Sequence, residues 1–173
     1  VTEQLAKRWS QPIIIDARPG ASSNVGTVAV AQSEPDGYTW LMAGPGLTAN
    51  PWLFKNVGWD PAKDFVGVGV AGTAPQVLVV GEKHPARSVR DLIALAKQKP
   101  GTVTAGTTNG SSSHFVLEAL KQAADVDLLL VPYNGAPPIV SDVVGGTVQA
   151  ASLPLAVVLP MVQVGRLRIL AIA

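Results

Sequence analysis

The sequence predicts an α/β fold in which mostly parallel sheets form two lobes. Short apolar segments of strand length alternate along the chain with segments of helical periodicity. The apolar segments are continuous rather than alternating with polar residues, which is typical of parallel strands covered on both faces. Residues 72–75, Gly-Thr-Ala-Pro, join two strand-like segments with no helix between them, and this favours a lobe boundary there.

The first lobe is expected to begin with a helix. Val1, Leu5 and Trp9 follow helical spacing, so a helix is predicted over residues 2–9. A second short helix, rich in Ala and Val, is predicted over residues 25–32. Strands are predicted at residues 13–15, 38–43 and 65–71.

The part of lobe one between its second and third strands is expected to be irregular. Gly44-Pro45-Gly46 breaks the chain after the second strand, and Asn50-Pro51 is expected to end any helix that starts there. Residues 47–64 are therefore predicted to lack regular structure.

The clearest helix of the chain lies in the second lobe. Ser88 stands at its cap, Asp91 occupies the capping-box position three residues later, and Pro100 stops the helix. The other helices of this lobe are predicted at 113–124, 137–144 and 154–164, and its strands at 76–80, 102–105, 128–131, 147–151 and 167–173.

Composition excludes several classes of function. The 173 residues are 47% hydrophobic and 14% charged, with a mean hydropathy of +0.30, which indicates a folded chain rather than a disordered one. Thirteen Lys and Arg residues against 12 Asp and Glu residues provide no basic face, so nucleic acid is not an expected partner. The absence of cysteine excludes disulfides, thiolate zinc sites and Cys nucleophiles. No apolar run reaches the roughly 18–20 residues of a membrane span.

The two ends of the sequence indicate a fragment. The chain has no initiating Met, opens within a helical pattern and stops inside the apolar run 167–173 without a turn or polar tail. We therefore interpret it as incomplete at both termini, with no signal peptide in the stretch given.

Catalytic and cofactor-binding motifs are nearly absent. His84 and His114 lie in different segments, and neither has a second ligand at i+3 or i+4, so no metal site is predicted. Ser112 and Ser113 precede His114, but neighbours on a starting helix do not face one another. A literal G-x-G-x-x-G at residues 67–72 lies inside a strand-like run, so no dinucleotide and no other cofactor is expected.

A polar loop at residues 107–113 is the strongest functional signal. It follows the strand at 102–105 and opens a helix, where free backbone N–H groups attract anions. A purely structural helix cap is the open alternative. Polar loops at 21–24, 48–50 and 133–135 follow other strands, and ligands of open α/β sheets bind at the carboxyl ends of strands. Together these loops predict a site for a small anionic or polar ligand.

A series of short motifs spans most of the chain. The motifs are Arg18-Pro19-Gly20-Ala21, Asn24-Val25-Gly26, Pro35-Asp36-Gly37-Tyr38-Thr39, Trp59-Asp60-Pro61, Lys63-Asp64-Phe65, Val131-Pro132-Tyr133, Gly145-Gly146 and Gly165-Arg166-Leu167-Arg168. In their order and combination they resemble the tripartite tricarboxylate transporter solute receptors, known as Bug receptors.

The resemblance implies a type II periplasmic-binding-protein-like fold with two Rossmann-like lobes. Such receptors are monomeric, non-enzymatic proteins of the periplasm that close on a small organic acid like a Venus flytrap and deliver it to a membrane permease. The implied division is lobe one at 1–72, a hinge crossing at 73–75, lobe two at 76–168, and the start of a return to lobe one at 169–173. The acid would then lie between the lobes.

The resemblance also implies binding residues by position. They are Thr48 and Asn50 in lobe one, and Thr107, Asn109, Ser111 and Ser112 in lobe two; no residue is implied as a metal ligand. The polar loops at 21–24 and 133–135 add Ser22, which stands where such receptors often have glycine, and Tyr133 as further candidate binding residues. Residues 151–154 carry no charge where such receptors often have an acidic residue. A ligand whose amino group needs a carboxylate partner is therefore not expected.

Two other functions stay open on the sequence alone. One is a small hydrolase-like α/β enzyme that uses the serine-rich loop 107–113 as an anion cradle. The other is a receptor of the same fold that signals through a partner protein instead of serving transport.

Overall fold

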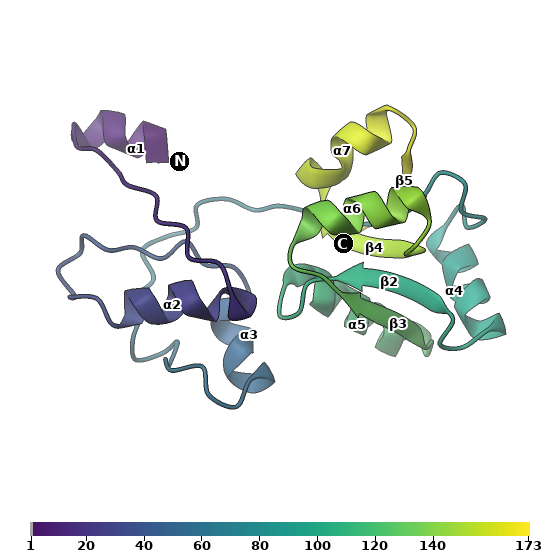
Figure 1. Cartoon of the computed structure of the whole chain (residues 1–173), viewed down its shortest axis with the longest axis horizontal. Coiled ribbons are helices and arrows are strands. Elements are labelled where there is room, and N and C mark those ends of the chain that lie inside the picture. Colours follow the sequence, from purple (N-terminus) through teal and green to yellow (C-terminus); the bar gives the residue numbers. More distant parts are fainter. Residues whose placement is uncertain (1) are drawn as a thin grey trace. The chain divides into compact units, whose positions relative to one another are not determined.

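The chain divides into two compact units in a computed structural model that describes residues 2–173. The first unit ends at Thr73, and the second unit comprises Ala74–Ala173 (Figure 1). Val1, which the sequence pattern joins to the first helix, lies outside the described residues.

A five-stranded sheet in the order β3-β2-β4-β1-β5 forms the second unit. The strands are β1 (Gln76–Gly81), β2 (Val103–Thr107), β3 (Leu128–Pro132), β4 (Ala150–Pro154) and β5 (Leu167–Ile172). Strand β2 runs parallel to β3 and β4, whereas β1 runs antiparallel to β4 and β5. The α/β fold is thus confirmed, and four of the five strands run in one direction, although two of the four strand pairings are antiparallel. The reversed direction of β1 was not predicted, because an apolar run reports burial on both faces and not strand direction.

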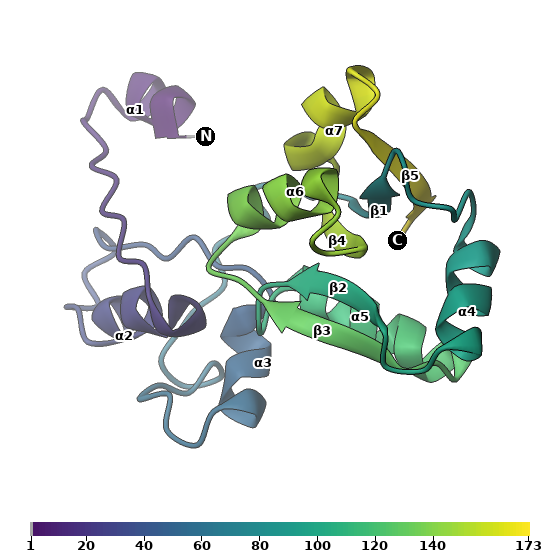
Figure 2. The same cartoon turned by 45° about the vertical axis from the view of Figure 1, so that its right-hand side comes forward.

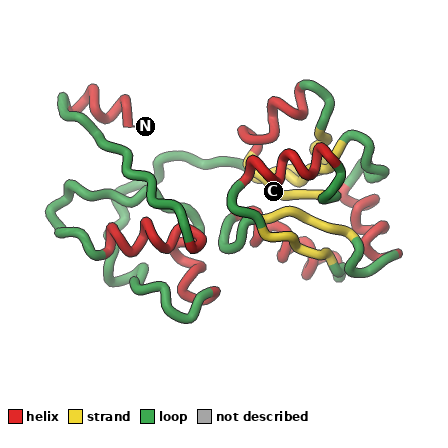
Figure 3. Tube along the Cα trace, in the orientation of Figure 1, coloured by secondary structure: helices red, strands yellow, loops and turns green. Residues whose placement is uncertain are grey.

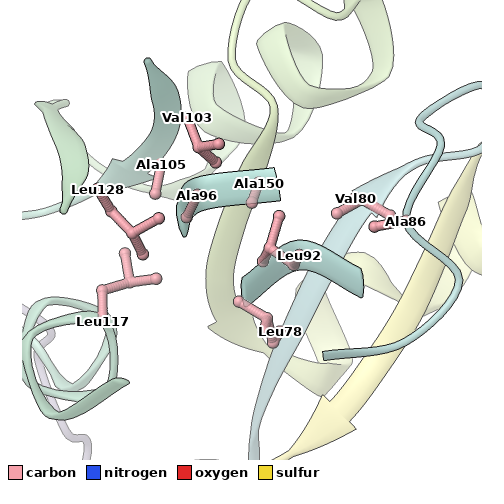
Figure 4. Packing of buried hydrophobic residues seen from close by; sticks show 10 residues of the cluster. All are labelled: Leu78, Val80, Ala86, Leu92, Ala96, Val103, Ala105, Leu117, Leu128 and Ala150. Atoms are coloured by element: carbon pink, nitrogen blue, oxygen red, sulfur yellow. The ribbon is translucent and has the colours of Figure 1, made fainter. Parts of the chain in front are cut away.

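Helices cover both faces of this sheet. They are α4 (Val89–Gln98), α5 (Ser112–Ala124), α6 (Ala136–Gly145) and α7 (Leu155–Gln163). Helices α4 and α5 lie on one face and α6 and α7 on the other (Figure 2). Alternate residues of β1 point to opposite faces: Leu78 and Val80 pack with α4 and α5 (Figure 4), and Val77 and Val79 pack with α6 and α7.

Local sequence signals place the helix ends of this unit well. The Ser88 Oγ accepts the Asp91 N–H at 3.2 Å, and Asp91 Oδ2 accepts the Arg87 N–H at 2.9 Å, which confirms the predicted cap of α4. Strand β4 begins at Ala150 rather than at residue 147. Gly146 ends α6 with a φ of 81°, and residues 147–149 still belong to the connection.

The cap of α4 is testable on its own. Ser88→Ala removes the side-chain acceptor of the Asp91 N–H and is expected to lower the free energy of unfolding by about 1 kcal/mol. Urea denaturation of the full-length protein measures the change. Ser141→Ala, at an exposed position inside α6, is the control and should change stability by less than about 0.5 kcal/mol.

The first unit contains helices and loops. Its elements are α1 (Thr2–Trp9), a 3₁₀ turn (Ala21–Ser23), α2 (Asn24–Ala31) and α3 (Gly46–Leu53). The helix predicted at 2–9 is confirmed, and the one predicted at 25–32 lies one residue earlier. The strands predicted at 13–15, 38–43 and 65–71 are wrong, since no strand forms among residues 2–73 (Figure 3). A strand needs a hydrogen-bonded neighbour, whereas Ile14 and Val66 are 88% and 90% exposed in this unit.

Helix α3 also contradicts the prediction of irregular chain over 47–64. Pro51 lies inside it, yet the Ala49 N–H still bonds to Pro45 O and the Phe54 N–H to Asn50 O. Asn50 is only 1% exposed, and its side chain donates hydrogen bonds to Ser22 O, just before α2, and to Asn24 Oδ1, at the first residue of α2. Buried tertiary contacts therefore outweigh the local cost of a proline.

Candidate functional site

The loop between β2 and α5 is a tight turn held by the first residues of the helix. Ser111 caps α5: its Oγ accepts the His114 N–H at 3.4 Å and donates to Thr108 O at 2.6 Å. Gly110 adopts a φ of 73°, a left-handed conformation that glycine takes without strain. The N–H groups of Ser112 and Ser113, at the start of a 13-residue helix, have no partners within the helix.

A layer of uncharged polar side chains lies on the sheet face that α5 covers, which we call the polar layer. It consists of Thr107 on β2, Ser152 on β4, Gln76 on β1 and Ser113 on α5. The parallel register that pairs Gly106 with Ala151 makes Thr107 and Ser152 neighbours. Ser113 Oγ donates to Gln76 Oε1 at 3.4 Å. The polar layer thus joins three strands to the helix start.

Two hydroxyls of the polar layer have no protein partner. Thr107 is 1% exposed and Ser152 fully buried, and neither oxygen has a hydrogen-bond partner among residues 2–173. Leaving a buried hydroxyl unpaired costs about 1–3 kcal/mol. Since both hydroxyls lie on the face that carries the unpaired N–H groups of α5, they favour a bound polar group at this place. They also weigh against the reading of the loop as a cap alone.

The other residues predicted from this loop are more accessible. Asn109 is exposed at the turn, and Ser111 and Ser112 are half-buried. The turn therefore offers the side chains of Asn109 and Ser112 to a ligand, whereas the Ser111 hydroxyl is occupied in capping.

His114 forms no catalytic pair with a serine. Its Nδ1 accepts the Gly110 N–H at 3.4 Å, and its Nε2 lies 3.8 Å from Glu118 Oε1. The Ser113 hydroxyl is directed to Gln76 instead. At the start of α5, His114 and Ser113 therefore do not form the hydrogen-bonded base and nucleophile that a serine hydrolase needs.

Tyr133 links the end of β3 to both β2 and α6. Its N–H donates to Thr107 O at 2.8 Å, and its hydroxyl donates to Asp142 Oδ2 at 2.5 Å. Tyr133 thus lies beside Thr107, but its hydroxyl is already engaged. Burial, together with the hydrogen bond to Asp142, raises the pKa of Tyr133 from 10.0 to about 12.

This link predicts a specific loss of stability in alkali. The pKa of Tyr133 is higher in the folded state than in the unfolded state. The hydrogen bond of the protonated Tyr133 hydroxyl therefore contributes fully to the free energy of unfolding below pH 10, and this contribution is lost as the pH rises toward 12. Tyr133→Phe should therefore be less stable than the wild type at pH 8, and the difference should shrink between pH 10 and 12. Thermal unfolding across this range measures it. A stability difference that stays constant with pH would contradict the link.

In the first unit, the structure brings together two of the predicted residues. Asn50 Nδ2 donates to Ser22 O at 2.9 Å and to Asn24 Oδ1 at 2.7 Å. Ser22 belongs to a turn in which Ala21, Ser22 and Ser23 all have positive φ values, of 44°, 54° and 74°. Thr48 is exposed, and its hydroxyl donates to Pro45 O at 3.1 Å.

Sequence reasoning missed Gln76 and Ser152 in the second unit. Ser113 and Asn24 lie in the polar loops 107–113 and 21–24 that the sequence singled out, but they were not among the predicted binding residues. The signal for Ser152 was a lone hydroxyl in the apolar run 150–155, which a register argument could have placed beside Thr107. Gln76 offered no such signal, since it gains its role from Ser113, a partner distant in the sequence.

Two further features lie away from the polar layer. A cavity of about 300 Å³ lies at the opposite end of β2 and is lined in part by His84, Leu95 and Gln149. Burial and the Arg168 charge lower the pKa of His84. Among residues 2–173, no cluster of acidic, His or Cys side chains is arranged to hold a metal ion, and no helix is long and apolar enough to span a membrane.

An open α/β sheet with an uncharged, donor-rich helix start at the carboxyl ends of its parallel strands is an arrangement in which such folds bind small ligands. A family model described as the tripartite tricarboxylate transporter family receptor, TctC, matches residues 1–173. The chain belongs to this family, as its sequence motifs predicted.

Curated relatives agree with this assignment. The chain is 34% identical over 175 residues to a UPF0065 protein of Bordetella bronchiseptica, covering 100% of this chain and 52% of that protein. It is also 34% identical over 165 residues to Protein BugT of Bordetella pertussis, covering 94% of this chain and 51% of that protein. The chain thus spans about half the length of these relatives.

Solved structures confirm the fold class. R. palustris Rpa4515 with adipate has a TM-score of 0.92 and 34% identity, covering 99% of this chain and 58% of that chain. Periplasmic binding protein BugD (TM-score 0.88) and MatC of Rhodopseudomonas palustris with bound malate (0.85) are each 24% identical to this chain and support the fold alone. The matches to BugD and MatC cover 99% of this chain and 57% and 59% of those chains.

Proposed function

We propose that this chain is part of a periplasmic receptor that captures a small organic acid and delivers it to the membrane permease of a tripartite transporter. The observation that carries the proposal is the pair of buried, unpartnered hydroxyls of Thr107 and Ser152 on the sheet face where α5 begins. Membership of a receptor family supports a binding role, and no enzymatic step is proposed.

A carboxylate is the group that suits this place. The N–H groups at the start of α5 and the nearby hydroxyls of Thr107 and Ser112 are donors, and the positive end of the helix dipole favours an anion. Because these donors are neutral, binding does not require a buried cation to lose its hydration. A relative that is 34% identical is described with adipate, a dicarboxylate, which supports this ligand class.

The ligand's remaining contacts are proposed from the resemblance. Asn109, Ser111 and Tyr133 belong to loops that adjoin Thr107, while Ser22 and Thr48 would contribute from the first unit. Asn50 would act through Ser22. We propose that the two units act as the lobes of a monomeric receptor, hinged at residues 73–75. Residues 169–172, expected to begin a return to lobe one, belong to β5 of the second unit.

Calorimetry on the full-length protein tests the proposed function. A panel of mono-, di- and tricarboxylates that includes acetate, adipate, malate and citrate should contain at least one binder in the micromolar range or tighter, about −8 kcal/mol. AMP and ATP serve as controls and should not bind. Binding of a nucleotide, with no carboxylate bound at millimolar concentration, would contradict the proposal.

A further inference from the structure

We propose that Asn50 is a positioning residue: it does not bind the acid itself but holds the left-handed turn Ala21–Ser23 in its binding conformation. The inference rests on the proposed function for the ligand and on the contacts of the first unit for the mechanism. It assigns Asn50 a different role from the direct contact expected from the sequence.

The donors of Asn50 are fully used. An asparagine amide carries two N–H donors, and here Nδ2 donates one hydrogen bond to Ser22 O at 2.9 Å and one to Asn24 Oδ1 at 2.7 Å. The remaining side-chain atom, Oδ1, is an acceptor, which would repel a carboxylate. Since Asn50 is 1% exposed, it has neither a free donor nor an accessible surface for the anion.

The turn that Asn50 contacts needs external support. Ala21, Ser22 and Ser23 have φ values of 44°, 54° and 74°, a left-handed region that residues other than glycine rarely adopt. Three such residues in succession persist only where the surrounding structure holds them. Asn50 bonds to the carbonyl of the central residue, Ser22, and to the side chain of Asn24, the first residue of α2.

The position of Asn50 suits this task. It lies on α3 and reaches residues 26 and 28 positions earlier in the chain. Gly46, one turn earlier on α3, leaves the room that the amide occupies, because a Cβ there would lie 3.3 Å from Asn50 Nδ2. Asn50 on helix α3 therefore fixes the backbone of the turn 21–23 through its two hydrogen bonds. Ser22 then faces the ligand from a backbone of fixed conformation.

Two variants test this role in the full-length protein. Asn50→Ala removes both donors, and Asn50→Asp keeps the size of the side chain but replaces the donors by acceptors. If only about a tenth of the molecules then hold the turn, adipate affinity should fall about tenfold in either variant. The exposed Asn56→Ala is the matched control and should bind adipate like the wild type.

A glycine rescue separates positioning from a general structural role. Ala21→Gly with Ser23→Gly makes the left-handed conformation accessible without strain. In the Asn50→Ala background, these two changes should recover most of the lost adipate affinity, although they restore no hydrogen bond. A loss that the glycines do not recover would show that Asn50 does not act through this turn. Affinity within twofold of wild type in both Asn50 variants would also overturn the inference.

A measurement without ligand keeps this inference distinct from the proposed function. Hydrogen exchange at the amides of residues 22–27 should be faster in Asn50→Ala than in the wild type, with no change in β1 of the second unit. Unchanged exchange would refute the positioning role even if the receptor binds adipate. A wild-type protein that binds no carboxylate, but shows the faster exchange on substitution, would refute only the proposed function.

Discussion

Ser112→Glu is expected to weaken carboxylate binding by at least about 100-fold. The substitution places a carboxylate at the first position of α5, beside the N–H groups proposed to bind the ligand. Juxtaposed like charges cost several kcal/mol, and each 1.4 kcal/mol is a factor of ten in affinity. Because an acidic residue in the first turn suits the helix dipole, the protein should remain folded. Calorimetry with the carboxylate that binds the wild type most tightly measures the loss.

The control for this experiment lies at the start of β2, the strand that precedes the loop carrying Ser112. Thr102→Glu adds the same charge at an exposed position just before β2 and should leave the affinity within about twofold of wild type. Equal losses in the two variants would indicate a general charge effect. Wild-type affinity in Ser112→Glu would remove the start of α5 from the binding site.

Leu117→Ala is expected to cause the largest loss of stability. Leu117 is fully buried on α5 and packs against the cluster formed by α4, α5 and the sheet (Figure 4). Truncating a buried leucine lowers the free energy of unfolding by about 2–5 kcal/mol, through lost burial and the cavity that remains. Since Leu117 anchors the helix whose first turn carries the site, ligand affinity should also fall.

The exposed Leu129→Ala on β3 is the matched control. Leu129 is 53% exposed, so its truncation should cost less than about 1 kcal/mol. Guanidinium denaturation of the full-length protein compares the two variants. Similar losses for Leu117→Ala and Leu129→Ala would contradict the packing described for α5.

The second unit could be predicted well from the sequence because its signals are local and mutually consistent. Each of these signals depends only on nearby residues: the cap at Ser88, the helix stop at Pro100 and the continuous apolar runs of the strands. All of them agree with the helix and the sheet that the structure contains. What the sequence could not provide was the direction of β1, which depends on its pairing with β4 and β5.

The first unit shows where such reasoning fails. The run at 13–15 has the composition of a strand, but strand formation depends on a partner, and none is present among residues 2–73. The prediction for the segment that forms α3 was wrong in the opposite sense. Pro51 argued against a helix there, but the buried hydrogen bonds of Asn50 hold the helix in place.

The helix start that carries the candidate site could be predicted, but the polar layer beneath it could not. Loop 107–113 was placed correctly at a helix start, since Ser and Thr after a strand signal this locally. The polar layer beneath it depends on registers between β2, β4 and β1, which a single sequence does not specify. Gln76 could therefore be found only in the structure, whereas the lone hydroxyl of Ser152 needed the strand register to give it a place.

The most direct test is a crystal structure of the full-length protein with the carboxylate that binds most tightly. A ligand carboxylate within about 3 Å of the Ser112 or Ser113 backbone nitrogen and of the Thr107 hydroxyl would agree with neutral donors at this sheet edge holding the acid. A carboxylate paired instead with an Arg or Lys side chain, and distant from the start of α5, would contradict the account.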